Sequence, residues 1–86
     1  MKYLLIAFKS RNSIYSFLSY LKSINIKAEI INTPKNISSS CGLSLKINLN
    51  YYQNIINLVR NNLKLNIIGV FIIEKIGFQE KIDRIF

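Results

Sequence analysis

Runs of apolar residues alternate with polar stretches along this chain, and two of these runs are almost unbroken. The first, Lys2 to Phe8, has aliphatic and aromatic residues at consecutive positions, which predicts a strand buried on both faces at the centre of a sheet. The second, Ile67 to Lys75, is rich in β-branched residues and predicts another strand. Both strands therefore need other parts of the protein against both of their faces.

Two weaker strands are expected between them. Ala28 to Asn32 predicts a short strand that ends before Pro34, because proline has no amide hydrogen to donate. Leu43 to Leu49 alternates apolar with polar residues, the period of two that is typical of a half-buried strand. On that pattern the residues exposed opposite the apolar face are Ser44, Lys46 and Asn48. We expect these two strands to be antiparallel neighbours.

Two other stretches have helical periodicity. From Arg11 to Ser23, after a potential cap at Ser10, apolar residues recur at spacings of three and four and draw one stripe. Its members are Ile14, Phe17, Leu18 and Leu21, with Ile24 extending it. A second helix is expected after Asn50, which with Gln53 resembles a capping box. Its apolar positions are Tyr52, Ile55, Ile56, Val59 and Leu63.

The resulting order βαββαβ predicts an α+β fold of the ferredoxin-like type, with a four-stranded antiparallel sheet and both helices on one face. We expect residues 1–76 to form a single domain and residues 77–86 to form a C-terminal tail. The second sheet face is then left bare although its strands are apolar. We therefore expect a homodimer, through this open face or an edge strand, or a docked tail.

The tail has apolar residues at roughly helical spacing, separated by charged ones. These apolar residues are Phe78, Ile82, Ile85 and Phe86. A short helix here would cover part of the second face, and a frayed terminus is the alternative.

The net charge and the length of the apolar stretches limit the kinds of partner that the protein is expected to have. Twelve lysines and arginines against four acids give a net charge of +8, which favours acidic partners. The charges form no basic block, so we interpret them as solvated faces and disfavour a nucleic-acid partner. The longest apolar stretch, Ile67 to Ile73, is too short to cross a bilayer. The apolar run before Lys9 is too short for a signal peptide, so we expect no membrane association.

Cys41 is the one residue suited to ordinary reaction chemistry, because the chain has no histidine and its carboxylates are scattered. A lone cysteine forms no disulfide within the chain, which fits a cytoplasmic location, and it supplies no metal site. A thiol reacts as its thiolate, which hydroxyls, amides and positive charge stabilise. The loop offers such groups at Ser38, Ser39, Ser40, Gly42 and Lys35, and beyond it Lys46 adds charge. The alternative is that Cys41 is a small buried hydrophobe.

The loop carries a long ungapped motif, which reads Thr33-Pro34-Lys35-Asn36-Ile37-Ser38-Ser39-Ser40-Cys41-Gly42-Leu43-Ser44-Leu45. It resembles the signature of the selenium/sulfur carrier protein-like family of small bacterial proteins, and the resemblance extends from Tyr3 to about Phe71. It implies that Cys41 accepts sulfur or selenium as a persulfide or perselenide. The implied partners are a donor such as a cysteine desulfurase and an acceptor protein. The chain lacks the Cys-Pro at a helix start that better-known sulfur-relay proteins use.

The leading hypothesis is therefore a carrier rather than an enzyme with its own turnover, and it needs no cofactor. The alternative is a small basic regulatory or nucleic-acid-binding module in which the cysteine is structural. A dimeric scaffold in which Cys41 only packs is a third possibility.

Overall fold

The computed structural model describes residues 1–37, 42–61 and 67–86 of the chain. Its elements, in chain order, are β1 (Lys2–Phe8), α1 (Arg11–Ser23), β2 (Ala28–Asn32), β3 (Leu43–Asn48), the short 3₁₀ helix η1 (Leu49–Tyr51), α2 (Tyr52–Asn61), β4 (Ile67–Ile76) and β5 (Gln79–Arg84). No helix within these described ranges is long and apolar enough to cross a membrane.

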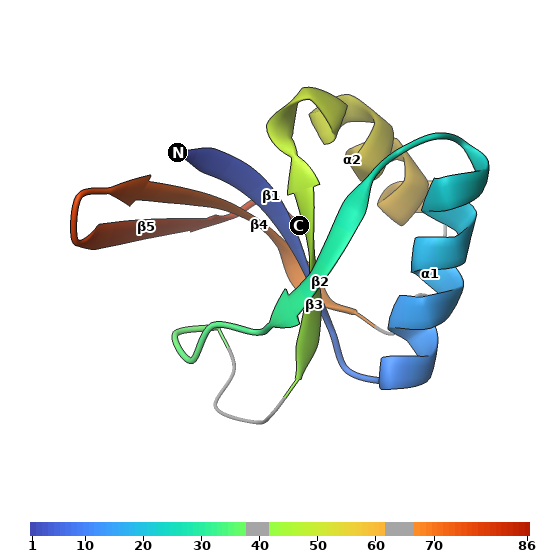
Figure 1. Ribbon diagram of the computed structural model, residues 1–86, viewed down its shortest axis with the longest axis horizontal. Coiled ribbons are helices and arrows are strands. Elements are labelled where there is room, and N and C mark those ends of the chain that lie inside the picture. The colour runs from blue at the N-terminus through green and yellow to red at the C-terminus, as the bar shows by residue number, and fades with distance from the viewer. Residues whose placement is uncertain (38–41, 62–66) are drawn as a thin grey trace.

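The strands form one antiparallel sheet in the order β2-β3-β1-β4-β5, with both helices beside it (Figure 1). β1 lies at the centre, as its unbroken apolar run predicts. The expectation of a four-stranded ferredoxin-like sheet is wrong, because residues 79–84 form a fifth strand against β4. The protein is α+β, and its order of elements is βαββαββ.

A tight turn places most of the C-terminal tail in this fifth strand, which is neither the short helix nor the frayed terminus considered from the sequence. Gly77 has a φ of +58° and, with Phe78, links the paired residues Ile76 and Gln79. Glycine with positive φ at the first of two turn residues is typical of a type II′ hairpin, which matches the twist of the flanking strands. Ile82 and Ile85, three residues apart, therefore pack against opposite faces of the sheet. Their spacing resembles that of a helix, but their contacts are those of a strand.

The larger core lies between the sheet and the two helices, as the helical stripes predict. Its buried members are Leu4, Ile6, Phe8, Ile14, Phe17, Leu21, Ile26, Leu45, Ile47, Ile55, Ile56, Val59 and Val70. Phe8 and Phe17 bring β1 and α1 together with ring centroids 5.8 Å apart. This helix-side core is built from alternate residues of the strands and one stripe of each helix.

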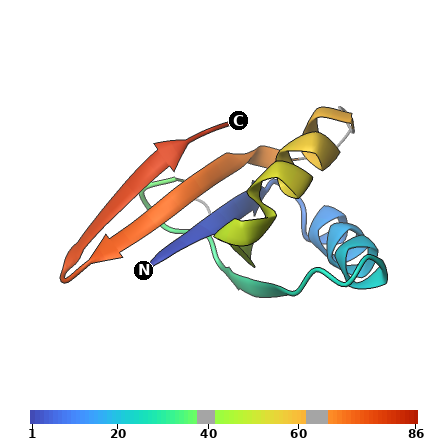
Figure 2. The same cartoon turned by 90° about the horizontal axis from the view of Figure 1, so that it is seen from above.

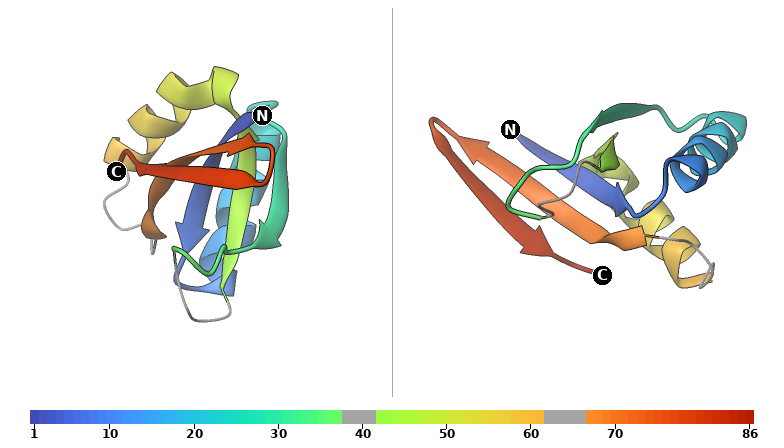
Figure 3. Two further views of the ribbon diagram at one scale, coloured as in Figure 1. Left: turned by 90° about the vertical axis from the view of Figure 1, so that its left-hand side faces the viewer. Right: turned by 90° about the horizontal axis from the view of Figure 1, so that it is seen from below.

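The sheet face opposite the helices is also apolar and buried, and we call its members the second cluster. They are Tyr3, Leu5, Ala7, Phe71 and Ile73, each at most 6% exposed. Ile37 from the segment after β2 and Ile82 of β5 pack against them. The β4–β5 hairpin extends on the side away from the helices (Figure 2) and runs across the other strands when that side is viewed (Figure 3, left). The predicted bare face is thus covered in part by the chain itself.

The end of α1 explains one wrong core assignment. Asn25 has a φ of 63°, its N–H donates to the Lys22 carbonyl, and the Ile26 N–H donates to the Leu21 carbonyl. These two bonds form a Schellman motif, in which the chain leaves the helix through a left-handed residue. Ile24 is consequently exposed, and Ile26 packs with Leu21 in its place.

The helix starts differ from the capping predicted from sequence. Ser10 occupies the N-cap position of α1, but its side chain makes no capping hydrogen bond. Before α2, the Asn50 N–H donates to the side-chain oxygen of Asn48 at 2.9 Å, so Asn48 is the N-cap of η1 and Asn50 lies inside that 3₁₀ helix. The predicted end of this helix at Leu63 lies outside the described residues.

Leu5→Ala tests whether the second cluster is a true core. We expect the free energy of unfolding to fall by about 2 to 5 kcal/mol, because the substitution leaves a cavity in a fully buried site. Urea denaturation measures this change. The matched control is Ile76→Ala at a residue that is 63% exposed, and equal losses in the two variants would show that the second face is not packed.

Candidate functional site

The candidate site is the connection between β2 and β3. The structure places Lys35 and Gly42 on either side of it, whereas Cys41 and the serines Ser38, Ser39 and Ser40 lie outside the described residues. Lys35 is exposed and Gly42 is half-buried. The site is therefore described by its two flanking segments, which are residues 33–37 after β2 and Gly42 before β3.

Thr33 and Gly42 hold these two segments together. The Thr33 N–H donates to the Gly42 carbonyl at 3.0 Å, directly beyond the last ladder pair, Asn32 with Leu43. The bond extends the β2–β3 ladder by one step. It fixes the backbone of Gly42, the immediate neighbour of Cys41, against the rigid sheet.

A buried pair of hydroxyls supports this junction. Thr33 Oγ1 and Ser44 Oγ are 2.6 Å apart, and Thr33 and Ser44 are 8% and 0% exposed. The prediction that Ser44 is exposed is therefore wrong. Each hydroxyl gives the other a hydrogen-bond partner that a buried polar group needs. Sequence reasoning missed this pair, because the register that sets Ser44 opposite the buried Ala7 of β1 is known only from the fold.

Gly42 is needed for close approach rather than for a special backbone angle. A Cβ at this position would lie 3.2 Å from Thr33 Oγ1 and 3.5 Å from the Phe8 carbonyl oxygen. Among the described residues, those with positive φ are Asn25 and Gly77, so Gly42 does not occupy a left-handed conformation. The glycine lets the end of β1 and the Thr33 hydroxyl pack directly against the backbone next to Cys41.

The first half of the connection turns back onto the sheet. The Ile37 N–H donates to the Pro34 carbonyl at 3.0 Å, which closes a four-residue turn. Ile37 packs on the second cluster, while Lys35 and Asn36 at the middle of the turn are exposed. An apolar anchor thus holds a turn that presents the Lys35 ammonium to solvent.

Lys46, which sequence reasoning offered as a second positive group for the loop, lies over an aromatic ring. Its Nζ is 4.8 Å from the centre of the Tyr3 ring, a cation–π contact. Burial raises the pKa of the Tyr3 hydroxyl, and the nearby Glu80 carboxylate raises it further. The Lys46 ammonium therefore contacts Tyr3 of β1. Among the described residues of the connection, the positively charged one is Lys35.

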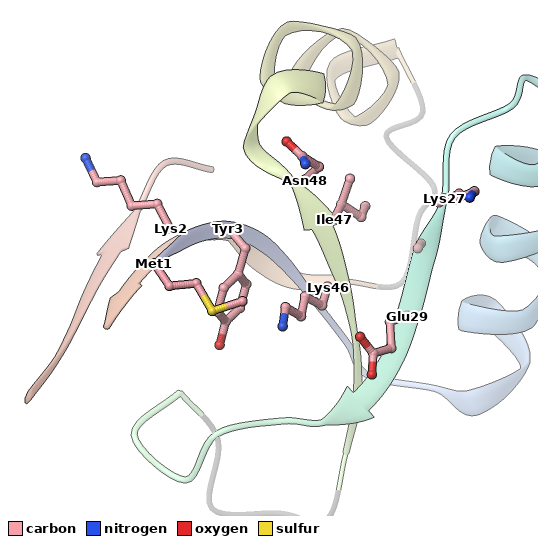
Figure 4. Close-up of a pocket in the computed structure, with 9 residues that line it drawn as sticks. Met1, Lys2, Tyr3, Lys27, Glu29, Lys46, Ile47 and Asn48 are labelled. Atoms are coloured by element: carbon pink, nitrogen blue, oxygen red, sulfur yellow. The ribbon is translucent and has the colours of Figure 1, made fainter. Parts of the chain in front are cut away.

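A separate depression of about 310 Å³ lies at the other end of β3 (Figure 4). It is lined by Met1, Lys2, Tyr3, Lys27, Ala28, Glu29, Lys46, Ile47 and Asn48. Lys46 is part of this lining, whereas Lys35 and Gly42, the described residues of the connection, are not. Within the part of the chain that the structure describes, no group of three His, Cys, Asp or Glu side chains is placed to hold a metal ion.

The comparisons bear on the same segment. A model of the family described as "Putative Se/S carrier protein-like" matches residues 3–72, which include β1 from its second residue, α1, β2, the connection with Cys41, β3 and α2. Searches of curated proteins and of solved structures return no significant match. The matched region ends within β4, so β5 is outside it.

Thr33→Val tests the buried hydroxyl pair. We expect it to lower the free energy of unfolding by about 1 to 3 kcal/mol, because it keeps the side-chain shape and leaves the Ser44 hydroxyl without a partner. Ser44→Ala should have a similar effect. The double variant should lose little more than either single one, and urea denaturation measures all three. Strictly additive losses would show that the two hydroxyls are not coupled.

Proposed function

The chain belongs to the Se/S carrier protein-like family, and we propose that it carries sulfur or selenium on Cys41. The observation that carries the proposal is the family match over residues 3–72, which spans the loop with the chain's single cysteine. Thiol chemistry fits this cargo, because a thiolate forms bonds to sulfur and selenium readily and reversibly.

Loading is a thiol exchange in which nothing is oxidised overall. The Cys41 thiolate attacks the outer sulfur of a donor persulfide, a new S–S bond forms on Cys41, and the old S–S bond breaks to release the donor as its thiolate. A donor carrying selenium in the outer position delivers a perselenide in the same way. An acceptor thiolate then attacks the outer atom on Cys41, takes it, and restores the Cys41 thiolate.

The anchored ends of the connection support this role. The Thr33 to Gly42 bond and the Thr33 to Ser44 hydroxyl pair hold the backbone beside Cys41 on the sheet. Gly42 allows this close packing. A carrier needs a thiol presented at a defined place, and a rigid frame beneath a polar loop provides this.

The remaining site residues stabilise charge in this proposal. The hydroxyls and amides of Ser38, Ser39 and Ser40 donate hydrogen bonds to the thiolate and to the outer atom when it is loaded. Lys35, exposed in the turn, contributes positive potential that favours the thiolate. Both effects lower the thiol pKa and raise its reactivity near neutral pH.

The proposed partners are a donor of the cysteine desulfurase type and an acceptor protein. The net charge of +8 favours encounters with acidic surfaces on them. A carrier of this kind has no turnover of its own and works in a reducing compartment, for which we propose the cytoplasm.

Direct transfer tests the proposal. After incubation with a cysteine desulfurase and cysteine, the intact wild-type protein should gain the mass of one sulfur atom, and a reductant should remove it. Intact mass spectrometry measures the gain. Cys41→Ala should gain nothing. Absence of the gain in wild type, or an equal gain in Cys41→Ala, would end the proposal.

The role of Lys35 has its own test. Lys35→Glu should slow alkylation of Cys41 at neutral pH by about twofold, because reversing a nearby charge raises the thiol pKa. The rate of iodoacetamide labelling against pH measures this pKa. Lys22→Glu makes the same charge change at the end of α1 and should leave the rate unchanged. A rate that falls equally in both variants would assign the effect to net charge alone.

A further inference from the structure

β5 is an edge strand with unusual charge. Within the described sheet it pairs with β4 on one side, and no other strand pairs with its outer side. It holds two of the chain's four acids, Glu80 and Asp83, beside Lys81 and Arg84. The strand is therefore neutral in a protein of net charge +8. Electrostatic repulsion between two positively charged copies is therefore weakest where they approach through β5.

The backbone of β5 shows which groups face outward. The Ile85 N–H donates to the Val70 carbonyl of β4, in line with the register that pairs Phe71 with Arg84. Backbone groups of successive residues in a strand point to opposite sides. The odd-numbered residues of β5 therefore bond to β4. Glu80, Ile82 and Arg84 direct their N–H and C=O groups away from it.

We propose that β5 pairs antiparallel with β5 of a second copy, with Ile82 facing its own symmetry mate. Even-numbered outward groups can pair only with even-numbered ones, which limits the symmetric registers. Moving the centre by one residue places Lys81 opposite Lys81, or Asp83 opposite Asp83. Centring on Ile82 instead places Lys81 opposite Asp83 and Glu80 opposite Arg84, each twice. Opposite charges across two strands stabilise pairing and like charges oppose it.

The side chains on β5 leave these contacts available. Lys81 and Asp83 are exposed and take part in neither of the two ion pairs recorded between described residues. Glu80 contacts Lys75 at 3.8 Å with its side chain 30% exposed. Arg84 lies over the Phe71 ring and donates to the Ile68 carbonyl at 3.1 Å. The Lys81 to Asp83 contacts therefore form without breaking a described ion pair.

The same register brings together the exposed aromatic residues at the two ends of the strand. Phe78 is 111% exposed and Phe86 is 40% exposed. With Ile82 on the symmetry axis, Phe78 of one copy falls next to Phe86 of the second copy, four positions from the centre on either side. Burying exposed aromatic side chains of this size against each other lowers the free energy of association.

Charge exchange between two variants tests the pairing. All proteins carry Cys41→Ser, so that no disulfide can join copies and the result is independent of the carrier proposal. Sedimentation velocity over a range of concentrations should show a wild-type dimer. Asp83→Lys and Lys81→Glu each place two like-charge pairs in the interface. Each should raise the dissociation constant by about tenfold.

Mixing the two variants should restore association, because a lysine at position 83 of one chain then meets a glutamate at position 81 of the other. Native mass spectrometry distinguishes the mixed dimer by mass. Glu29→Lys and Lys22→Glu make the same charge changes away from β5, and should leave the wild-type constant almost unchanged. Circular dichroism confirms that each variant folds.

Three results would overturn the proposal. The first is a wild-type protein that stays monomeric at every concentration. The charges on β5 would then act to prevent edge-to-edge pairing of sheets. The second is an equal loss of association in the variants on β5 and in their controls. The third is the absence of a mixed dimer when Asp83→Lys and Lys81→Glu are combined.

Discussion

Burial of β1 on both faces is the constraint on which the rest of the structure depends. Tyr3 to Phe8 are all at most 6% exposed, so each residue needs a partner surface whichever way it points. The helices supply this surface for Leu4, Ile6 and Phe8. The opposite face has no helix within the described residues, and there the turn with Ile37 and the added strand with Ile82 pack on the second cluster. The candidate loop and β5 are thus both part of the cover of one strand.

This arrangement ties the candidate site to the core. Phe8 at the end of β1 contributes its carbonyl beside Gly42, and Ile37 fixes the first half of the connection on the second cluster. The Thr33 and Ser44 hydroxyls then satisfy each other where the connection meets the sheet. Packing therefore determines the backbone position on both sides of the cysteine segment. The side chain of Lys35, by contrast, is exposed to solvent.

The sequence pattern predicted correctly those elements whose bounds depend on neighbouring residues in the chain. The helix from Arg11 to Ser23 and the strand from Ala28 to Asn32 were predicted with the bounds they have, because periodicity and Pro34 mark them within a few residues. The fifth strand was missed because its single apolar residue, Ile82, stands between two adjacent pairs of charged residues, so no hydrophobic period of two marks it. The burial of Ser44 was missed because its partner, Thr33, is 11 residues away and is brought close only when the chain folds back. A local sequence pattern does not predict contacts between residues that only tertiary folding brings together.

The sheet order separates the two surfaces to which we assign roles. The connection with Cys41 joins β2 and β3 at one edge, and β5 forms the other edge, with β1 and β4 between them. Pairing through β5 would continue the sheet into a second copy and leave β2 as the outer strand at both ends of the joined sheet. Because β5 lies outside the region matched by the family, association can change in this chain without altering the segment that carries the cysteine.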